Sequence, residues 1–292
     1  MSSYKSINYL SIDTQDFREV MDSQSHTLSN DSFGMVMHGS PNHTSFLHPG
    51  QIYHLVEPRI ILVAKGYGRV NINLESYDIC QGTAVLATAD IIMEPSMWSP
   101  DIEIIGIIFK EDIPVHETIV QPCSPAEFAR LLRMAYIVWD LANQLPFRQQ
   151  AVLQMVGAIA SNIQYLKEAT ASTERSIAPT RSQKLFQQFK TLVNQHCDSE
   201  RNIPFYADLL FVSPHHLSAV ISKASGHSVM YWVNRAVILK AKVLLKTSGL
   251  MSYEIAERLH FPSSSAFSSF FKREAGMTPK EYVSLSVPRK KP

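Results

Sequence analysis

The sequence predicts an α+β protein of two domains, with a β-rich domain followed by an all-α domain. The chain has 292 residues, which is enough for two separate cores. Short runs rich in Val, Ile and Tyr recur between residues 33 and 109, whereas apolar residues recur at helical spacing after residue 182. The charge divides at the same place: residues 1–182 hold 12 Lys+Arg and 19 Asp+Glu, and residues 183–292 hold 15 and 7. Net charges of −7 and +8 indicate that the second part meets a polyanion.

The region 33–109 is expected to form a sandwich or a small barrel, because several short strands follow one another between turn residues. Residues 1–30 show no clear element. The segment Lys65-Gly66-Tyr67-Gly68 predicts a tight turn, since glycine accepts positive φ. The predicted strands are Phe33–Met37, Ile52–Val56, Arg59–Ala64, Gly68–Asn73, Thr83–Ala87, Ile91–Glu94 and Ile102–Phe109.

Two amphipathic helices are predicted over 124–167. Ser124 is placed to cap the first, with Pro125 at its first position and Glu127 at its third. The second follows Asn143–Pro146. These helices could cover the core of their own β-domain, and they could in addition dimerise. Residues 169–182, ATASTERSIAPTRS, are small and polar and read as a linker.

The remaining chain predicts two helix-turn-helix units. After a packing helix over Gln183–Cys197, a short helix over Pro204–Leu210 is followed by a three-residue turn and a helix over Pro214–Ser225. Ser213 is its expected cap and Gly226 its end. The buried side chains are expected to be Leu217, Val220 and Ile221.

The second unit repeats this order. Ser252 is expected to cap a helix over Tyr253–Leu259, and Ser263 a helix over Ser264–Ala275, which Gly276 closes. The buried residues are expected to be Ile255, Ala256, Phe267 and one of Phe270 and Phe271. An uninterrupted helical pattern over Val229–Thr247 joins the units and would span about 28 Å at ~1.5 Å per residue. Such a rod could place two recognition helices in successive major grooves, about 34 Å apart.

The C-terminal part resembles the AraC/XylS family of bacterial regulators over roughly residues 183–285. The matching residues are Ala207, Val212-Ser213, Leu217-Ser218, Gly226, Ala241-Lys242, Leu244-Leu245, Ile255-Ala256, Phe261-Pro262-Ser263, Ser265, Phe267, Phe271-Lys272, Gly276-Met277-Thr278-Pro279 and Tyr282. The resemblance implies a DNA-binding transcription regulator, often an activator, with double-stranded DNA and RNA polymerase as partners. It also implies an N-terminal cupin-like β-barrel or jelly roll that senses a small molecule or dimerises. The expected domains are 1–168, the linker 169–182 and the DNA-binding domain 183–292.

The sequence departs from the family pattern at several positions. His260 stands where the family usually has Gly before the turn Phe, so either a non-glycine residue takes positive φ there or the turn differs. Val237 replaces the common Arg of the connecting helix, Ile221-Ser222 replaces Phe-Lys, and Val283 replaces Arg after the final Tyr. The first unit is therefore the less typical one.

Contacts with DNA are expected from the outward positions of the two recognition helices. The first offers His215, His216, Ser218 and Ala219, and the family pattern implies base contacts near His215, Ser218 and Ala219. The second offers Ser264, Ser265, Ser268 and Ser269, with Lys272 and Arg273 near its end. Serines discriminate bases poorly, so affinity is expected to come mainly from phosphate contacts. Further phosphate candidates are Lys223, Lys240, Lys242, Lys246 and the tail Arg289-Lys290-Lys291.

Other classes of function find little support. His38, His43, His48 and His54 lack the H-x-H spacing that resembles a cupin metal site, so no metal and no cofactor is expected. No nucleophile elbow, zinc-protease motif or phosphate-binding loop is present, and we expect no enzyme activity. An effector pocket in the β-domain and dimerisation without a ligand both remain open.

The three cysteines, Cys80, Cys123 and Cys197, form no CxxC pair and are expected to be free thiols. The N-terminus has no apolar signal-peptide core, and no apolar run reaches the ~20 residues of a membrane helix. A soluble cytoplasmic protein is therefore the expectation. A homodimer is also expected, because the family resemblance implies an N-terminal domain that senses a small molecule or dimerises.

Overall fold

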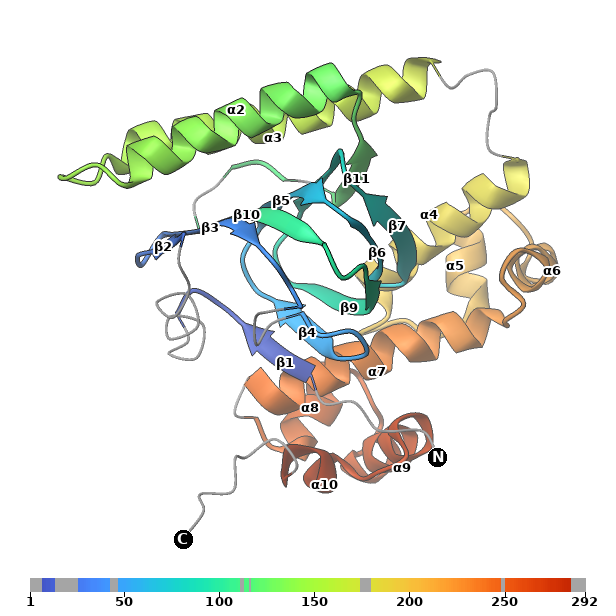
Figure 1. Cartoon of the computed structure of the whole chain (residues 1–292). Coiled ribbons are helices and arrows are strands. Elements are labelled where there is room, and N and C mark those ends of the chain that lie inside the picture. The colour runs from blue at the N-terminus through green and yellow to red at the C-terminus, as the bar shows by residue number, and fades with distance from the viewer. Residues whose placement is uncertain are drawn as a thin grey trace, which may run out of the picture. The chain divides into compact units, whose positions relative to one another are not determined.

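The computed structural model describes residues 7–13, 26–42, 47–110, 113–115, 117–173, 180–247 and 250–284. The chain divides into two compact units, one formed by Asn8–Ser176 and the other by Met1–Ile7 with Ile177–Pro292. The first unit is a β-domain with a helix pair, and the second is built from helices between residues 180 and 284 (Figure 1). An N-terminal β-rich domain and a C-terminal helical domain are thus confirmed.

Two sheets build the first unit. Sheet A has the strand order β1-β4-β9-β6-β7, and sheet B the order β11-β8-β5-β10-β3-β2. The neighbouring strands whose register is defined run antiparallel. The strands are β1 Ile7–Leu10, β2 Thr27–Ser29, β3 Phe33–Gly39, β4 Ile52–Leu55, β5 Arg59–Lys65, β6 Tyr67–Ile72, β7 Glu75–Cys80, β8 Thr83–Ala87, β9 Ile91–Trp98, β10 Glu103–Phe109 and β11 Ile119–Pro122.

The predicted strands are all present, but the sequence patterns missed four others. Residues 1–30 were expected to lack structure, yet β1 and β2 lie there. The strand β7 was missed because its residues alternate between exposed and half-buried, with only Ile79 buried, so they form no apolar run. The strand β11 pairs with β8 directly before the helix pair. It has four residues, which is too short to give a clear strand pattern in the sequence.

The predicted turn at Lys65–Gly68 carries the chain from sheet B to sheet A, since β5 and β6 belong to different sheets. Gly66 has a φ of 76°, and a Cβ at this position would lie 2.4 Å from Ser99 Oγ and 2.7 Å from Ile102 Cα. Both the backbone conformation and the close approach therefore require glycine.

The first core fills the space between the two sheets. Tyr53 and Val70 enter it from sheet A, and Val63 and Val85 enter it from sheet B. A second core lies on the other face of sheet B, where Ile60, Leu62 and Ile107 pack against the helix pair. Sheet B is thus buried on both faces, which accounts for the nearly continuous apolar run of β5.

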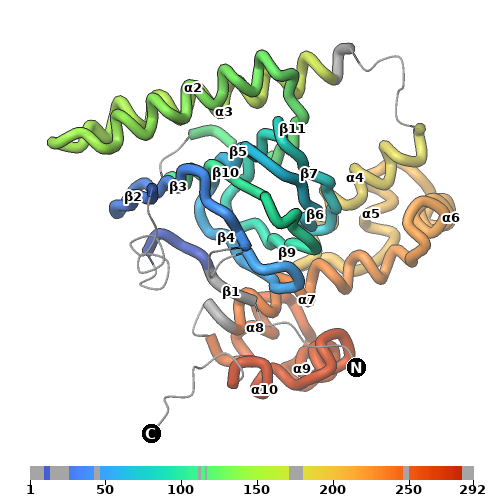
Figure 2. Tube along the Cα trace, in the orientation of Figure 1, coloured from blue at the N-terminus to red at the C-terminus, as the bar shows by residue number. Residues whose placement is uncertain are grey.

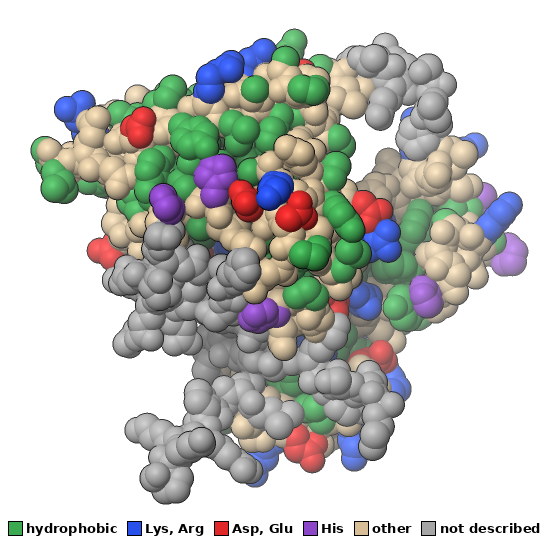
Figure 3. Space-filling view, viewed as in Figure 1, with side chains coloured by type: hydrophobic (Ala, Val, Ile, Leu, Met, Phe, Trp, Pro, Cys, Tyr) green, Lys and Arg blue, Asp and Glu red, His purple; other side chains and the backbone are tan. Residues whose placement is uncertain are grey.

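The helix pair is formed by α2 (Pro125–Ala142) and α3 (Gln149–Thr173), which run side by side over sheet B (Figure 1). Ser124 caps α2 as predicted, and Glu127 completes a capping box. Helix residues such as Leu131, Val138, Val156 and Ile163 are buried against the sheet. The pair therefore covers the core of its own domain, as both alternatives required. Tyr136, Ile137 and Tyr165 of the helix pair remain 44%, 45% and 68% exposed, and Figure 3 shows hydrophobic side chains along α2.

The second unit contains α4 Arg181–His196, α5 Ile203–Leu209, α6 Pro214–Ser225, α7 Val229–Thr247, α8 Ser252–Arg258, α9 Ser264–Ala275 and α10 Pro279–Ser284. The predicted linker is shorter than 169–182, because α3 continues to Thr173 and α4 begins at Arg181. Thr180 and Gln183 form a capping box there. Thr180 was assigned to the polar linker in the sequence, although it is the N-cap of this helix.

Within this unit, α4, α5 and α6 gather near one end of α7, and α8, α9 and α10 gather near its other end (Figure 2). Aromatic rings fill both groups. Phe189 packs edge-on against Tyr206 with centroids 5.6 Å apart, and Phe271 against Tyr282 at 5.4 Å. Among the described residues, no helix combines the length and hydropathy needed to cross a membrane.

Candidate DNA-binding interface

Both helix-turn-helix units form as the sequence predicts. In the first, α5 is followed by the turn 210–213 and by α6; in the second, α8 is followed by the turn 259–263 and by α9. The second turn is one residue longer, because Pro262 lies between Phe261 and the capping Ser263. The predicted inward residues are buried, including Leu217, Ile221, Ile255 and Phe267, and Phe270 and Phe271 are both buried.

Local capping fixes where each recognition helix begins and ends. Ser213 Oγ accepts a hydrogen bond from His216 N at 3.2 Å, and Ser263 Oγ accepts one from Ala266 N at 3.1 Å. Gly226 and Gly276 end the two helices in the left-handed conformation, with φ of 71° and 76°. The two helices consequently have the same length of 12 residues.

The helix α8 starts differently from the prediction. Its cap is Met251, and Ser252 is already the first helical residue. The Met251 N–H donates to Glu254 Oε2 at 2.7 Å, so a carboxylate three residues ahead satisfies one of the N–H groups at this N-terminus. The prediction placed the cap one residue too late, because Ser252 carries a side chain typical of a cap and Met251 does not.

The turns settle the question that His260 raises. His260 adopts a φ of 52°, so the turn keeps its left-handed residue although no glycine is present. Phe211 adopts a φ of 55° in the first turn and is 95% exposed. Both turns thus contain a non-glycine residue in a conformation that costs about 1–2 kcal/mol.

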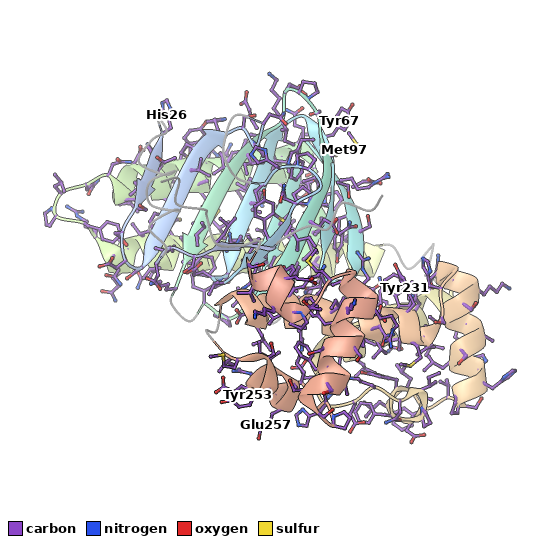
Figure 4. All side chains as sticks on the ribbon, turned by 90° about the horizontal axis from the view of Figure 1, so that it is seen from below. His26, Tyr67, Met97, Tyr231, Tyr253 and Glu257 are labelled. Atoms are coloured by element: carbon purple, nitrogen blue, oxygen red, sulfur yellow. The ribbon has the colours of Figure 1, made fainter. Side chains whose placement is uncertain are left out.

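The predicted contact residues lie on the outer faces of the two helices. On α6, His215, His216 and Ala219 are exposed and Ser218 is half-buried. On α9, Ser264, Ser265 and Ser269 are exposed and Ser268 is half-buried. The structure therefore brings the predicted residues of each helix together on one accessible surface. In the same unit Tyr253, 61% exposed, and Glu257 lie on the outer surface of α8 (Figure 4).

The cationic side chains predicted to contact phosphates differ in their exposure and in their contacts within the protein. Lys272 is exposed at the end of α9. Arg273 is exposed too, but its Nε and NH2 donate to Glu274 Oε1 at 2.9 and 2.8 Å, and its guanidinium lies 5.2 Å from the Phe270 ring. A phosphate would have to compete with this pair.

Among the other lysines, Lys223 is exposed on α6. Lys240 forms a 2.6 Å ion pair with Asp198. A DNA phosphate would therefore have to compete with this carboxylate for the Lys240 ammonium group. Lys242 lies 5.9 Å above the Tyr282 ring. The side chain of Lys246 and the tail Arg289-Lys290-Lys291 lie outside the described residues.

One well-placed residue gave no sequence signal. Arg201, in the loop between α4 and α5, reaches the turn of the second unit, where its guanidinium lies 3.7 Å from the Phe261 ring centroid. Burial lowers the pKa of Arg201. An isolated arginine in a polar loop has no pattern that could reveal a contact 60 residues away along the chain, so only the tertiary structure shows it.

The histidines of the β-domain lie apart. His38 Nε2 is 2.6 Å from the Tyr136 hydroxyl, and His54 Nε2 is 3.2 Å from Asp90 Oδ1. His48 is exposed in a loop, and His43 lies outside the described residues. Within the described ranges, no three His, Cys, Asp or Glu side chains are grouped so that they could hold a metal ion.

Comparison with known proteins agrees with the geometry of the second unit. A family model described as a helix-turn-helix domain matches residues 206–284. The chain is 32% identical over 76 residues to the uncharacterized HTH-type transcriptional regulator YpdC of Escherichia coli K12, which is 26% of this chain and 27% of that protein. It is 36% identical over 66 residues to the HTH-type transcriptional activator RhaR of Yersinia pseudotuberculosis, which is 23% of each. The chain thus spans about a quarter of the length of these relatives.

Among solved structures, ToxT of Vibrio cholerae O395 is similar at 15% identity and a TM-score of 0.36, over 88% of this chain and 98% of that one. A TM-score of 0.36 is too low to support a conclusion about the fold of the whole chain. The domain match, the two relatives and the paired turns all concern the same segment. In its C-terminal third, the chain carries a helix-turn-helix domain of the AraC/XylS type.

Proposed function

We propose that this protein is a sequence-specific DNA-binding transcription regulator that reads duplex DNA with both α6 and α9. The observation that carries the proposal is the pair of capped recognition helices, each with its polar face exposed, in a segment of net charge +8. A polyanion is attracted to such a segment, and two helices of this kind fit successive major grooves.

The contacts are assigned as follows. His215, His216, Ser218 and Ala219 of α6 face one groove, and Ser264, Ser265, Ser268 and Ser269 of α9 face the next. Lys272 and Arg273 contact phosphates. Ala219 offers only an apolar contact, such as to a thymine methyl group, and serines bond to bases or phosphates with little discrimination. Affinity therefore comes mainly from phosphates, and specificity comes in large part from DNA shape and half-site spacing.

The full-length protein provides the test. Duplexes that it binds are selected from a random pool, and their affinity is then measured by fluorescence anisotropy at several salt concentrations. We expect a linear fall of log K with log salt concentration. Failure to enrich any sequence would overturn the proposal, and tight binding without salt dependence would contradict its phosphate-led part.

Regulation by a small-molecule effector bound in the N-terminal domain is the finer part of the proposal. It is supported by the separation of the chain into a β-rich unit and a helix-turn-helix unit, which gives sensing and DNA binding separate places. A thermal-shift screen of the full chain against metabolites, sugars and fatty acids tests it. A ligand that raises the melting temperature and changes DNA affinity would support control by an effector.

Dimerisation without a ligand is the rival role for the N-terminal domain. It is favoured by Tyr136, Ile137 and Tyr165, which are large apolar side chains of the helix pair that remain exposed. Sedimentation of the chain and of an Ile137→Glu variant separates the two roles. A dimer that the variant abolishes, with no response in the ligand screen, would favour dimerisation alone. Because the RhaR relative is named an activator, we further propose activation through RNA polymerase as the partner.

A further inference from the structure

The loop between α4 and α5 is held firmly within the first helix-turn-helix unit. The Tyr206 hydroxyl donates to the Glu200 carbonyl at 2.7 Å, and Tyr206 itself is fully buried. Asn202 Oδ1 accepts from Phe205 N at 2.9 Å and so caps α5. Asp198 pairs with Lys240 of α7 at 2.6 Å. The backbone on both sides of Arg201 is therefore fixed to α5 and to the connecting helix.

From this fixed loop, Arg201 reaches the turn of the second unit. Its NH2 group donates a hydrogen bond to the Leu259 carbonyl, and its guanidinium stacks on Phe261 with 3.7 Å from Cζ to the ring centroid. Its Nε is buried and has no hydrogen-bond partner among the described residues. The carbonyl and the ring are thus the contacts that hold the guanidinium, and they lie on the two sides of His260.

Leu259 and Phe261, which Arg201 contacts, connect it to the helices α8 and α9 of the second unit. Leu259 is the C-cap of α8, where an added positive charge complements the helix dipole. The Phe261 ring packs on Phe267 and Phe270 of α9, with centroid distances of 5.3 and 5.1 Å. A planar guanidinium combines stacking with directed hydrogen bonding, whereas an ammonium group does not.

We propose that Arg201 is a positioning residue that locks the second recognition helix to the first helix-turn-helix unit and thereby sets the half-site spacing that the chain accepts on duplex DNA. This inference rests on the proposed function. The helix α7 packs against α6 of the first unit and against α8, α9 and α10 of the second, and Asn234 Nδ2 donates to Glu274 Oε1 of α9 at 3.3 Å. Both units are thus attached to this one helix. The Arg201 contact adds a second attachment away from that helix, so the two recognition helices present one fixed spacing.

The experiment uses the full-length chain and the selected duplex, together with duplexes that have one base pair added or removed between the half-sites. Binding is compared for the parent, Arg201→Ala and Arg201→Lys. Lys223→Ala is the matched control, because it removes an exposed cation from α6 and leaves the bridge intact. The parent is expected to lose about tenfold in affinity or more on the altered spacings, which is a coupling within the usual range for contacting groups.

Both Arg201 variants are expected to bind the selected duplex more weakly and to lose most of this discrimination, so that the ratio between spacings falls to about threefold or less. Lys223→Ala is expected to bind every duplex more weakly at an unchanged ratio. An unchanged ratio in the Arg201 variants, or a parent that ignores spacing, would overturn the inference while DNA binding stands. Absence of binding by the parent would instead remove the proposed function.

A measurement without DNA keeps the inference testable on its own. Spin labels on Ala224→Cys of α6 and Lys272→Cys of α9, in a background with Cys80→Ser and Cys123→Ser, report the distance between the recognition helices. We expect one narrow distribution in the parent and a broader one after Arg201→Lys. If the Arg201 variants do not fold, Phe261→Leu removes the cation–π contact while keeping an apolar side chain, and the same broadening is expected. Equal widths would overturn the proposal.

Discussion

Phe211 and His260 occupy equivalent places in the two turns, and both have left-handed backbone with φ of 55° and 52°. Phe211 N donates to Asp208 O at 3.1 Å, and His260 N donates to Glu257 O at 2.9 Å. The residue after each donates to an alanine carbonyl, at 3.0 Å in the first unit and 2.8 Å in the second. The same chain reversal is therefore built twice from different residues.

Glycine at either position is expected to stabilise the helical unit. It would relieve about 1–2 kcal/mol of strain and would lose part of that gain to the greater freedom of the unfolded chain, for a net rise of about 0.5–1 kcal/mol. Phe211 is 95% exposed, so its removal costs little packing. Calorimetry of the full chain measures the effect, with Phe211→Ala and His260→Ala as controls that keep the Cβ. Glycine variants no more stable than the alanine variants would show that the turns are unstrained.

The end of α9 should contribute to DNA affinity without affecting sequence preference. Lys272→Ala is expected to weaken binding about equally on all duplexes and to reduce the salt slope by about one. Arg273→Ala should have the smaller effect, because Arg273 is already paired with Glu274. Glu274→Gln is the matched control, since it frees Arg273 and should strengthen binding. A change in preferred sequence in the Lys272→Ala/Arg273→Ala double variant would contradict a phosphate role.

Two neighbouring serines of the second unit should separate stability from recognition. Ser263 caps α9, so Ser263→Ala is expected to lower the free energy of unfolding by about 1 kcal/mol. Ser265 is exposed, so Ser265→Ala should change stability by less than about 0.5 kcal/mol. It should nevertheless weaken DNA binding by about 0.5–1.5 kcal/mol, the contribution of one hydrogen bond. Unchanged DNA affinity would mean that Ser265 is only a solvated surface residue.

The helical unit was predictable almost to the residue because its signals are local. Ser213, Gly226, Ser263 and Gly276 act within one turn of their own helix, and each functions as its residue type suggests. In the β-domain, strands were harder to predict where the sequence contains no continuous run of apolar residues. The strand β7 has only Ile79 buried, and it is defined by its pairing with β6.

The candidate site shows the same division. The outward positions on α6 and α9 follow from helical periodicity and the caps. The sequence does not show which cationic side chains already have a partner within the protein. Lys240 pairs with Asp198, and Arg201 stacks on Phe261, only in the folded unit. These partners are 42 and 60 residues apart, so no periodic pattern in the sequence reveals them. The sequence could therefore identify the lysines and arginines but could not show which of them are available to contact DNA.

The three cysteines should differ sharply in reactivity. Cys80 is exposed. Burial, with the charge of Glu127 as a smaller cause, raises the pKa of Cys123 to about 11. Burial also raises the pKa of Cys197 to about 12. Since the thiolate is the reactive form, only about one in a thousand Cys123 side chains, and fewer of Cys197, are reactive at pH 8.

A disulfide-exchange reagent at pH 8 is therefore expected to modify one thiol per folded chain promptly. Cys80→Ser should remove this fast phase, whereas Cys123→Ser should leave it intact, and urea should make all the remaining thiols reactive. Two fast thiols in the folded chain would contradict the raised pKa of the half-buried Cys123. Because Cys123 directly precedes the capping Ser124, its protection also reports whether the start of α2 stays closed over sheet B.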